Sequence, residues 1–248
     1  MGVLNVIPDV RGTKLWSPRE LPALEVWQDF SVAGTLFTDA GTTQVVNDSD
    51  AIYQANDRSG HGNHVIQTSA PARPLHKRNI LNGRAVGRFD AINDGMTCAT
   101  PTLSQPLTQI VVVKLAVVDS VANIPLDSLG GTGCWVGTWS GLWSIYAGSS
   151  VNSPGSVAAD TNATILVGTF NGASSKLWIN GGVGGVAGGP GSNGMSGLSI
   201  GYDTKFSVPL KGDLGDSVVC STILSLDDIN RAGSHFGAKY GITWTTAS

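Results

Sequence analysis

The stretch Asn56-Asp57-Arg58-Ser59-Gly60-His61-Gly62-Asn63-His64 carries the most information about the fold of this chain. Its aspartate, serine, glycine and asparagine residues are typical of tight turns, because they either allow a positive φ or bond to nearby backbone groups through their side chains. The dipeptide Asn82-Gly83 and the segment from Arg88 to Asp94 (RFDAIND) follow along the chain. This order of turns and strand-like runs predicts a particular kind of β-sandwich.

The composition also favours an all-β protein. The 248 residues include 33 glycines, and charged residues make up only 13% of the chain. Frequent Val, Ile, Thr and Ser together with glycine favour many short strands joined by turns. All-β sandwiches of this length often form a single domain. We therefore expect residues 1–25 to form an N-terminal arm or docking segment, and residues 26–248 to form one folded domain.

The charges and cysteines exclude several classes of protein. The net charge is −3 and no cluster of lysine and arginine is present, so nucleic-acid binding has no electrostatic support. The three cysteines, Cys98, Cys134 and Cys220, are widely spaced and form no C-x-x-C pair. Neither a zinc site nor a disulfide framework is therefore indicated, and buried free thiols are the favoured interpretation. No cofactor is expected.

The N-terminus shows no targeting signal. It lacks a basic region followed by a long apolar run, and position 6 is Val6 where a myristoylation motif needs Ser or Thr. No apolar stretch is long enough to span a bilayer. The sequence predicts a protein made in a cytoplasm, without membrane insertion.

Six segments are expected to be strands: 86–89, 109–118, 164–170, 176–179, 198–202 and 214–220. The second of these is nearly all apolar (QIVVVKLAVV), as a strand buried on both faces would be. Residues 176–179 lead into Asn180-Gly181, a strong hairpin signal. The glycine-rich run 181–197 is expected to form a loop or an edge hairpin.

One helix is predicted near the C-terminus. Ser225 suits the N-cap with Asp228 three positions later, which is close to a capping box. Lys239 lies in the expected last turn, and Gly241 suits the position after it. The apolar residues share one helical face, which predicts packing against the sandwich: Leu226, Ile229, Ala232, Phe236 and Tyr240.

Further features follow the opening turn in order: Pro74, Asn82-Gly83, Phe89-Asp90 and Asn93-Asp94, then the segments LWING (177–181) and GDLGD (212–216). With them, roughly residues 26 to 244 resemble the concanavalin A-like, laminin-G-like jelly-roll domains. The resemblance implies a lectin-like jelly-roll β-sandwich with a short C-terminal helix. The family more often has a glycine directly after the Phe-Asp pair, where this chain has Ala91.

A second resemblance is more specific. The segment 35–43 (TLFTDAGTT) lies upstream of the turn, and Ala72-Arg73-Pro74 lies downstream. This combination is similar to jelly-roll proteins of tailed-bacteriophage virions. It implies a virion structural or adhesion protein at a tail, fibre or capsid surface, with other virion subunits and host cell-surface glycans as partners. Because closed symmetric assemblies are common for such subunits, a homo-oligomer is expected.

Enzymatic activity is not predicted. Glycoside hydrolases need two closely placed carboxylates, and the only glutamates, Glu20 and Glu25, precede the expected core. The four histidines show no metal-binding spacing, and no nucleophile elbow or phosphate-binding loop occurs. Two aspartate pairs are expected at turns and at a helix start, where structural roles are common: Asp213 with Asp216, and Asp227 with Asp228.

The aspartate-rich turns could hold calcium, since they offer oxygen ligands: Asp57, Asn63, Asp90, Asn93 and Asp94. The structural alternative is that these side chains cap turns through hydrogen bonds to the backbone. We favour turn-capping and expect no metal, because no fixed ligand spacing is present. Asn93 and Asp94 are retained as candidate ligand-binding residues.

Three tryptophans lie close together in residues 134–143 (CWVGTWSGLW). In one continuous strand they would share a face, but Ser140-Gly141 favours a hairpin that exposes Trp139 near its tip. Trp135 and Trp143 are expected in the core. Since sugars bind on exposed aromatic platforms beside polar groups, Trp139 is the principal ligand-binding candidate.

The sequence thus predicts a non-enzymatic phage virion protein with a lectin-like domain for assembly or for contact with host glycans. Fold alone does not determine function. Two alternatives remain: a stand-alone carbohydrate-binding module and, third, a polysaccharide-degrading enzyme.

Overall fold

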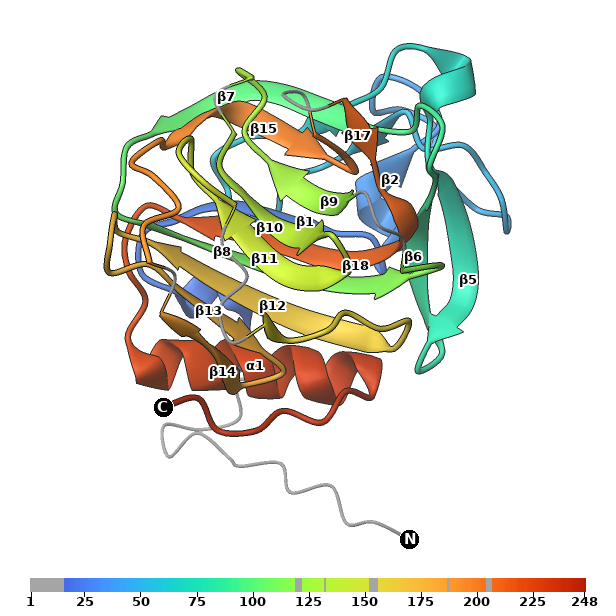
Figure 1. Cartoon of the computed structure of the whole chain (residues 1–248). Coiled ribbons are helices and arrows are strands. Elements are labelled where there is room, and N and C mark those ends of the chain that lie inside the picture. Colours follow the sequence, from blue (N-terminus) through green and yellow to red (C-terminus); the bar gives the residue numbers. More distant parts are fainter. Residues whose placement is uncertain (1–15, 119–121, 132, 152–155, 187, 204–206) are drawn as a thin grey trace, which may run out of the picture.

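The computed structural model describes residues 16–248 apart from 119–121, 132, 152–155, 187 and 204–206. Most of the predicted arm, residues 1–15, lies outside the described residues. The described part of the chain is an all-β sandwich with one α-helix near the C-terminus (Figure 1). The predicted fold class is confirmed.

Sheet A has eight antiparallel strands. Their order is β14-β13-β12-β8-β18-β6-β5, and β1 also pairs with β18. The bounds of these strands are β1 Leu24–Asp29, β5 Leu75–Leu81, β6 Arg84–Asp90, β8 Leu107–Leu115, β12 Ala163–Phe170, β13 Lys176–Ile179, β14 Gly182–Val186 and β18 Lys211–Cys220.

Sheet B also has eight strands, in the order β11-β10-β9-β15-β7-β4-β3-β2, and the short strands β16 and β17 form a separate hairpin. The bounds of these strands are β2 Leu36–Phe37, β3 Gln54–Ala55, β4 Val65–Ile66, β7 Met96–Leu103, β9 Ala122–Asp127, β10 Trp135–Trp139, β11 Leu142–Tyr146, β15 Met195–Ile200, β16 Tyr202–Asp203 and β17 Val208–Pro209. Three short 3-10 helices complete the described elements: Pro18–Glu20, Ala33–Thr35 and Ala70–Ala72.

Strand β8 shows how the layers are stacked. Val111 and Val113 belong to the main core between the two sheets, whereas Ile110 and Val112 belong to a second core. Because successive side chains of a strand point to opposite faces, sheet A is buried on both faces. This confirms the prediction from the valine-rich run.

The second core lies between sheet A and the helix α1 (Leu226–Tyr240) (Figure 1). The helix begins as predicted, since the Ser225 hydroxyl accepts the Asp228 N–H, and it ends at Gly241 in the left-handed conformation (φ 69°). Ile229 and Phe236 are buried against sheet A. Leu226 differs from the prediction, because it is 45% exposed at the first helical position.

Two predicted hairpins are present. Asn180 and Gly181 have φ values of 51° and 88° and join β13 to β14, as an Asn-Gly turn requires. Strand β14 is an edge strand, so the glycine-rich run begins as the second strand of an edge hairpin. Ser140 and Gly141, with φ values of 51° and 76°, join β10 to β11.

Two expectations about position differ from the structure. Asp213 and Asp216 lie inside strand β18 rather than at turns, because β18 continues through both residues to pair with β8 and β1. Strand β1 begins at Leu24, so the sandwich includes the last two residues assigned to the arm. The rest of the division into arm and domain stays a prediction.

The cysteines are free in the structure. Cys134 and Cys220 are buried and Cys98 is half-buried. Burial raises the pKa of the Cys220 thiol to about 12, so this thiol is protonated at neutral pH. The two buried thiols act as small apolar groups, as predicted.

Candidate functional site

Both carboxylate oxygens of Asp57 accept hydrogen bonds from groups within the protein. One carboxylate oxygen of Asp57 accepts the N–H groups of Trp27 and Ser59, both at 2.9 Å. The other oxygen accepts the Ser59 hydroxyl at 2.6 Å and the Asn63 N–H at 3.1 Å. The carboxylate therefore caps the turn and fastens it to strand β1. This confirms the structural interpretation of the stretch.

Asn63 connects the same turn to sheet B through its side chain. Its side-chain amide donates to the Glu25 carbonyl at 2.8 Å, and its side-chain oxygen accepts the Thr100 hydroxyl at 2.6 Å. Glu25 lies in β1 and Thr100 lies in β7. The turn thus links the two sheets at one end of the sandwich.

Asn93 and Asp94 lie in the connection between β6 and β7. Asp94 is 4% exposed and accepts the Asp90 N–H at 3.0 Å, whereas Asn93 is exposed. Burial, and then the neighbouring Asp90 charge, raise the pKa of Asp94 to about 6. Strands β15 and β9 separate β7 from β10. At the usual strand spacing this places the connection roughly 14 Å across sheet B from Trp139. The role of Asn93 and Asp94 in ligand binding stays a prediction.

Trp139 ends strand β10 and is half-buried. Its ring stacks on Trp135 with ring centroids 6.3 Å apart and planes at 22°. Trp135 stacks in turn on Tyr146 of β11 at 5.6 Å and 25°. We call Trp139, Trp135 and Tyr146 the aromatic row. Trp135 and Tyr146 are buried, so Trp139 is the member of the row that reaches solvent.

The aromatic row lies on the outer face of sheet B. Val136 belongs to the core between the sheets, so its neighbour Trp135 points the other way. Trp135 belongs to a small separate cluster with Ile124 and Val208. Trp143 points inward instead, into the main core. The hairpin therefore places two of the three tryptophans on one face and one on the other, and both predicted core tryptophans are buried.

A buried charged network that the sequence analysis missed lies under the helix. Asp29 of β1 and Asp216 of β18 are register partners and are 2% and 0% exposed. The ammonium of Lys239 bridges them at 2.8 Å and 2.6 Å. Asp29 also accepts Arg58, and Asp216 accepts the Tyr240 hydroxyl at 2.5 Å.

The surroundings of this network shift the pKa values of its two carboxyls in opposite directions. Burial, and then the Asp29 charge, raise the pKa of Asp216 to about 6. Lys239 and the Ser31 hydroxyl outweigh burial at Asp29 and lower its pKa. Both carboxylates are closed off from solvent, so the network has the character of a structural bridge between β1, β18 and α1.

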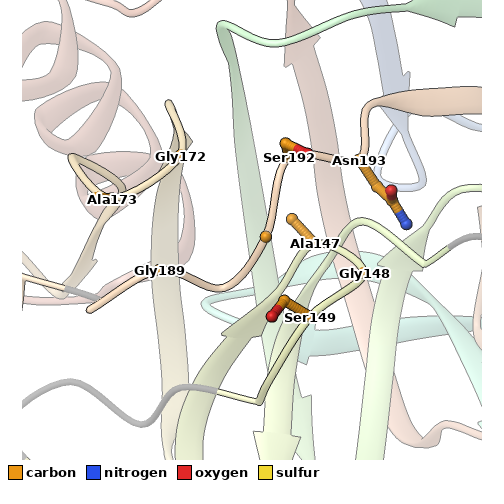
Figure 2. A pocket seen from close by; sticks show the side chains of 9 residues that line it. Ala147, Gly148, Ser149, Gly172, Ala173, Gly189, Ser192 and Asn193 are labelled. Carbon is orange, nitrogen blue, oxygen red and sulfur yellow. The ribbon is translucent and has the colours of Figure 1, made fainter.

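An open hollow of about 360 Å³ lies where three segments meet (Figure 2). It is bordered by residues 147–149 after β11, by Gly172 and Ala173 between β12 and β13, and by part of the segment 189–193. In the sequence this last segment is part of the glycine-rich run 181–197. That run was the one signal for the hollow, because the other two segments carry no distinctive motif.

Among the described residues, no group of three or more His, Cys, Asp or Glu side chains is placed to hold a metal ion. No helix in the described part of the chain combines the length and apolar character needed to cross a membrane.

Comparison with known proteins identifies the type of fold but no family. No protein-family model and no curated protein sequence matches this chain. Among solved structures, it is similar to an arabinofuranosidase complexed with arabinofuranosyl-α-1,2-xylobiose, with a TM-score of 0.65 and 13% identity over 87% of this chain and 62% of that one. It is also similar to a GH54 α-L-arabinofuranosidase, with a TM-score of 0.63 and 14% identity over 92% of this chain and 64% of that one.

A third similar structure is a botulinum neurotoxin type C whose cell entry depends on interaction with two ganglioside molecules. Its TM-score is 0.56 at 12% identity, over 86% of this chain and 51% of that one. The present chain spans less than two thirds of each of these three chains. At such low identity the likeness defines the class of fold, a β-sandwich that also occurs in carbohydrate-acting and carbohydrate-binding proteins.

Proposed function

We propose that this chain is a non-enzymatic, lectin-like β-sandwich that binds carbohydrate on the outer face of sheet B, with Trp139 as the stacking platform. The observation that carries the proposal is the half-buried Trp139 ring, which is supported from behind by Trp135 and Tyr146. An aromatic ring held rigidly at a surface offers a sugar a large contact area at a small cost in side-chain entropy.

The shape of the molecule supports this location. The outer face of sheet A packs against α1, so it is not open to a ligand. Three solved structures with a similar sandwich are described as sugar-processing or ganglioside-dependent proteins. The similarity supports a carbohydrate ligand without specifying which one.

The non-enzymatic part of the proposal rests on the carboxylates. Asp29 and Asp216 are buried beneath α1 and bridged by Lys239. Glu25 accepts the Ser221 hydroxyl at 2.7 Å. None of these three is placed as an open pair that could flank a glycosidic bond. Release of reducing ends from a bacterial surface polysaccharide by the purified chain would contradict this part and favour a polysaccharide-degrading enzyme.

We further propose, from the segment 35–43 and Ala72-Arg73-Pro74, that the domain belongs to a tailed-phage virion, where it contacts other subunits and host glycans as a homo-oligomer. Light scattering coupled to size-exclusion chromatography tests the assembly. A chain that stays monomeric at high concentration and joins no particle would leave the stand-alone carbohydrate-binding module as the better interpretation.

A glycan array that includes bacterial surface polysaccharides tests the carbohydrate proposal. We expect the wild-type chain to bind at least one glycan and Trp139→Ala to bind it at least about tenfold more weakly, equivalent to about 1.4 kcal/mol. Tyr53→Ala is the matched control, because Tyr53 is a half-buried aromatic residue directly before β3, which lies next to the edge strand β2 on the other side of sheet B. Equal losses in both variants, or an array without any binding, would contradict the proposal.

A further inference from the structure

We infer that the hollow in Figure 2 is a second carbohydrate subsite, which holds one neutral monosaccharide unit. This inference rests on the proposed carbohydrate-binding function, but it concerns a different place on the molecule.

The Gln105 side chain fixes two of the three segments around the hollow. Its oxygen accepts the Gly172 N–H at 2.7 Å. Its amide nitrogen donates to the carbonyls of Gly191 and Asn193, at 3.2 Å and 2.8 Å. One side chain thus joins the β12–β13 turn to the segment before β15, and this wall of the hollow is fixed before any ligand arrives.

Backbone hydrogen bonds fix the third segment. The N–H groups of Ala147 and Ser149 both donate to the Pro190 carbonyl, at 2.9 Å and 3.0 Å. The Asn193 N–H donates back to the Ala147 carbonyl at 3.0 Å. Gly191 makes this close approach possible, since its φ is 121° and a Cβ there would collide with the Ala147 carbonyl. The walls are therefore held together, so the hollow is a feature of the folded structure.

The space between these walls is unfilled. A Cβ added to Gly172 or to Gly189 would meet no atom within 4 Å. The volume of about 360 Å³ lies near the lower end of the range for small-molecule sites, about 300–1,000 Å³. A site of this size and openness suits one small polar unit better than an extended ligand.

The chemistry of the lining selects against charged ligands. None of the residues that line the hollow is charged or aromatic, and the polar side chains among them are Ser149, Ser192 and Asn193. Hydroxyl, amide and main-chain groups can exchange hydrogen bonds with the hydroxyls of a neutral sugar. A carboxylate or an ammonium would lose part of its hydration there without gaining an ion pair. The class of ligand is therefore a neutral polyhydroxylated unit.

The hollow and Trp139 lie at opposite ends of one hairpin. Trp139 pairs with Leu142 beside the turn, while Trp135 pairs with Tyr146, directly before Ala147 at the hollow. At the usual rise of an antiparallel strand, the four steps from Leu142 to Tyr146 span about 14 Å. This distance exceeds a single sugar ring, so the two places would hold different units, and each can be disabled separately.

Ala173→Trp tests the inference, because Ala173 is exposed and lines the hollow. An indole there would occupy the space without replacing a buried group. Ser174→Trp is the matched control, since Ser174 is the next exposed residue and does not line the hollow. Ser149→Trp blocks the hollow from the opposite wall if Ala173→Trp fails to fold, as judged by its unfolding temperature.

The probes are neutral monosaccharides (glucose, galactose, mannose and arabinose), with galacturonate and glucosamine as charged counterparts, measured by ligand-observed NMR in the millimolar range. We expect at least one neutral sugar to bind, the charged counterpart to bind more weakly, and Ala173→Trp to lose binding at least tenfold while Ser174→Trp keeps it. Binding unchanged in Ala173→Trp would overturn the inference.

Failure of the inference and failure of the proposed function give different results. If no monosaccharide binds the wild type while Trp139-dependent binding on the array persists, the hollow is not a subsite and the proposed function stands. If neither measurement detects binding, both are contradicted. Stronger binding of galacturonate than of galactose would also overturn the inference, because it requires a positive partner that the lining lacks.

Discussion

Lys239→Met should destabilise the fold far more than its position near the end of the chain suggests. Lys239 is 12% exposed, and its ammonium bridges the buried carboxylates of Asp29 and Asp216 at 2.8 Å and 2.6 Å. Methionine has a similar length and keeps the packing of the aliphatic stem, so the substitution removes mainly the positive charge. Two carboxylates would then lie side by side with one of their cations removed.

The magnitude follows from burial. Removing one partner from a buried ion pair typically costs about 3–5 kcal/mol, because the remaining charge loses its compensation. Asp29 keeps Arg58, whereas the donors that Asp216 keeps among the described residues, Trp27 and Tyr240, are neutral. In a domain of about this size each kcal/mol lowers the unfolding temperature by about 2–4 °C, so we expect a fall of about 6–20 °C.

Thermal and urea unfolding followed by circular dichroism measure this change. Arg231→Met is the control on the same helix, since Arg231 forms an exposed i,i+4 pair with Asp227 at 2.9 Å. Exposed pairs of this kind contribute about 0.5 kcal/mol or less. If Lys239→Met lowers stability no more than Arg231→Met does, the buried network is not a structural bridge and the reasoning above is wrong.

The pH dependence of Lys239→Met gives a second check. Burial, and then the charge of Asp29, raise the pKa of Asp216 from its ordinary value of 3.8 to about 6, and Lys239 opposes this shift. Without Lys239 the pKa of Asp216 should rise further. A carboxyl with a raised pKa binds its proton more tightly in the folded state, so the stability deficit of the variant should shrink as the pH falls from 7 toward 5. A deficit that grows on acidification would refute the argument.

Three further predictions concern other parts of the fold. Ser225→Ala removes the N-cap hydroxyl that accepts the Asp228 N–H at 3.1 Å and should cost about 1 kcal/mol in urea unfolding; an unchanged midpoint would mean that the cap is dispensable. Burial raises the pKa of Asp94 to about 6, so the folded state takes up the proton before the unfolded state does, and the wild type should gain stability as the pH falls from about 6 to about 4. Asp94→Asn should abolish this gain; a pH profile identical to that of the wild type would contradict the prediction. Asp57→Ala leaves three backbone N–H groups and one hydroxyl without their acceptor and should cost at least about 2 kcal/mol, whereas a loss below about 0.5 kcal/mol would show that water replaces the carboxylate.

Features that depend on neighbouring residues could be predicted from the sequence. The cap at Ser225, the end of α1 at Gly241 and the Asn180-Gly181 hairpin each depend on a few adjacent positions, and the structure confirms all three. The two-sided burial of β8 was also predictable, because a run of apolar residues at successive positions leaves no polar face. Such features depend on the chemistry of adjacent residues, which can be read directly from the sequence.

The buried charged network could not be predicted in the same way. Asp29, Asp216 and Lys239 are far apart in the sequence, and nothing near any of them specifies the other two. Lys239 was predicted only as a cation in the last turn of the helix. The register of β1 on β18 and the packing of α1 bring the three together. The hollow has the same origin, since three separate segments border it.

The arrangement of the layers limits where this molecule can bind a partner on its sheets. Helix α1 packs on the outer face of sheet A, so the amphipathic helix that stabilises the sandwich also removes one of its two outer faces. The remaining face is that of sheet B, and the β10–β11 hairpin places Trp135 and Trp139 there while turning Trp143 into the core. A continuous strand would have put all three tryptophans on one side. The Ser140-Gly141 turn therefore divides the aromatic residues between packing and exposure, and it leaves Trp139 at the surface with Trp135 behind it. If Trp139 served the core alone, replacing it would lower stability and leave glycan binding unchanged, so the glycan array and the unfolding temperature of Trp139→Ala together separate the two roles.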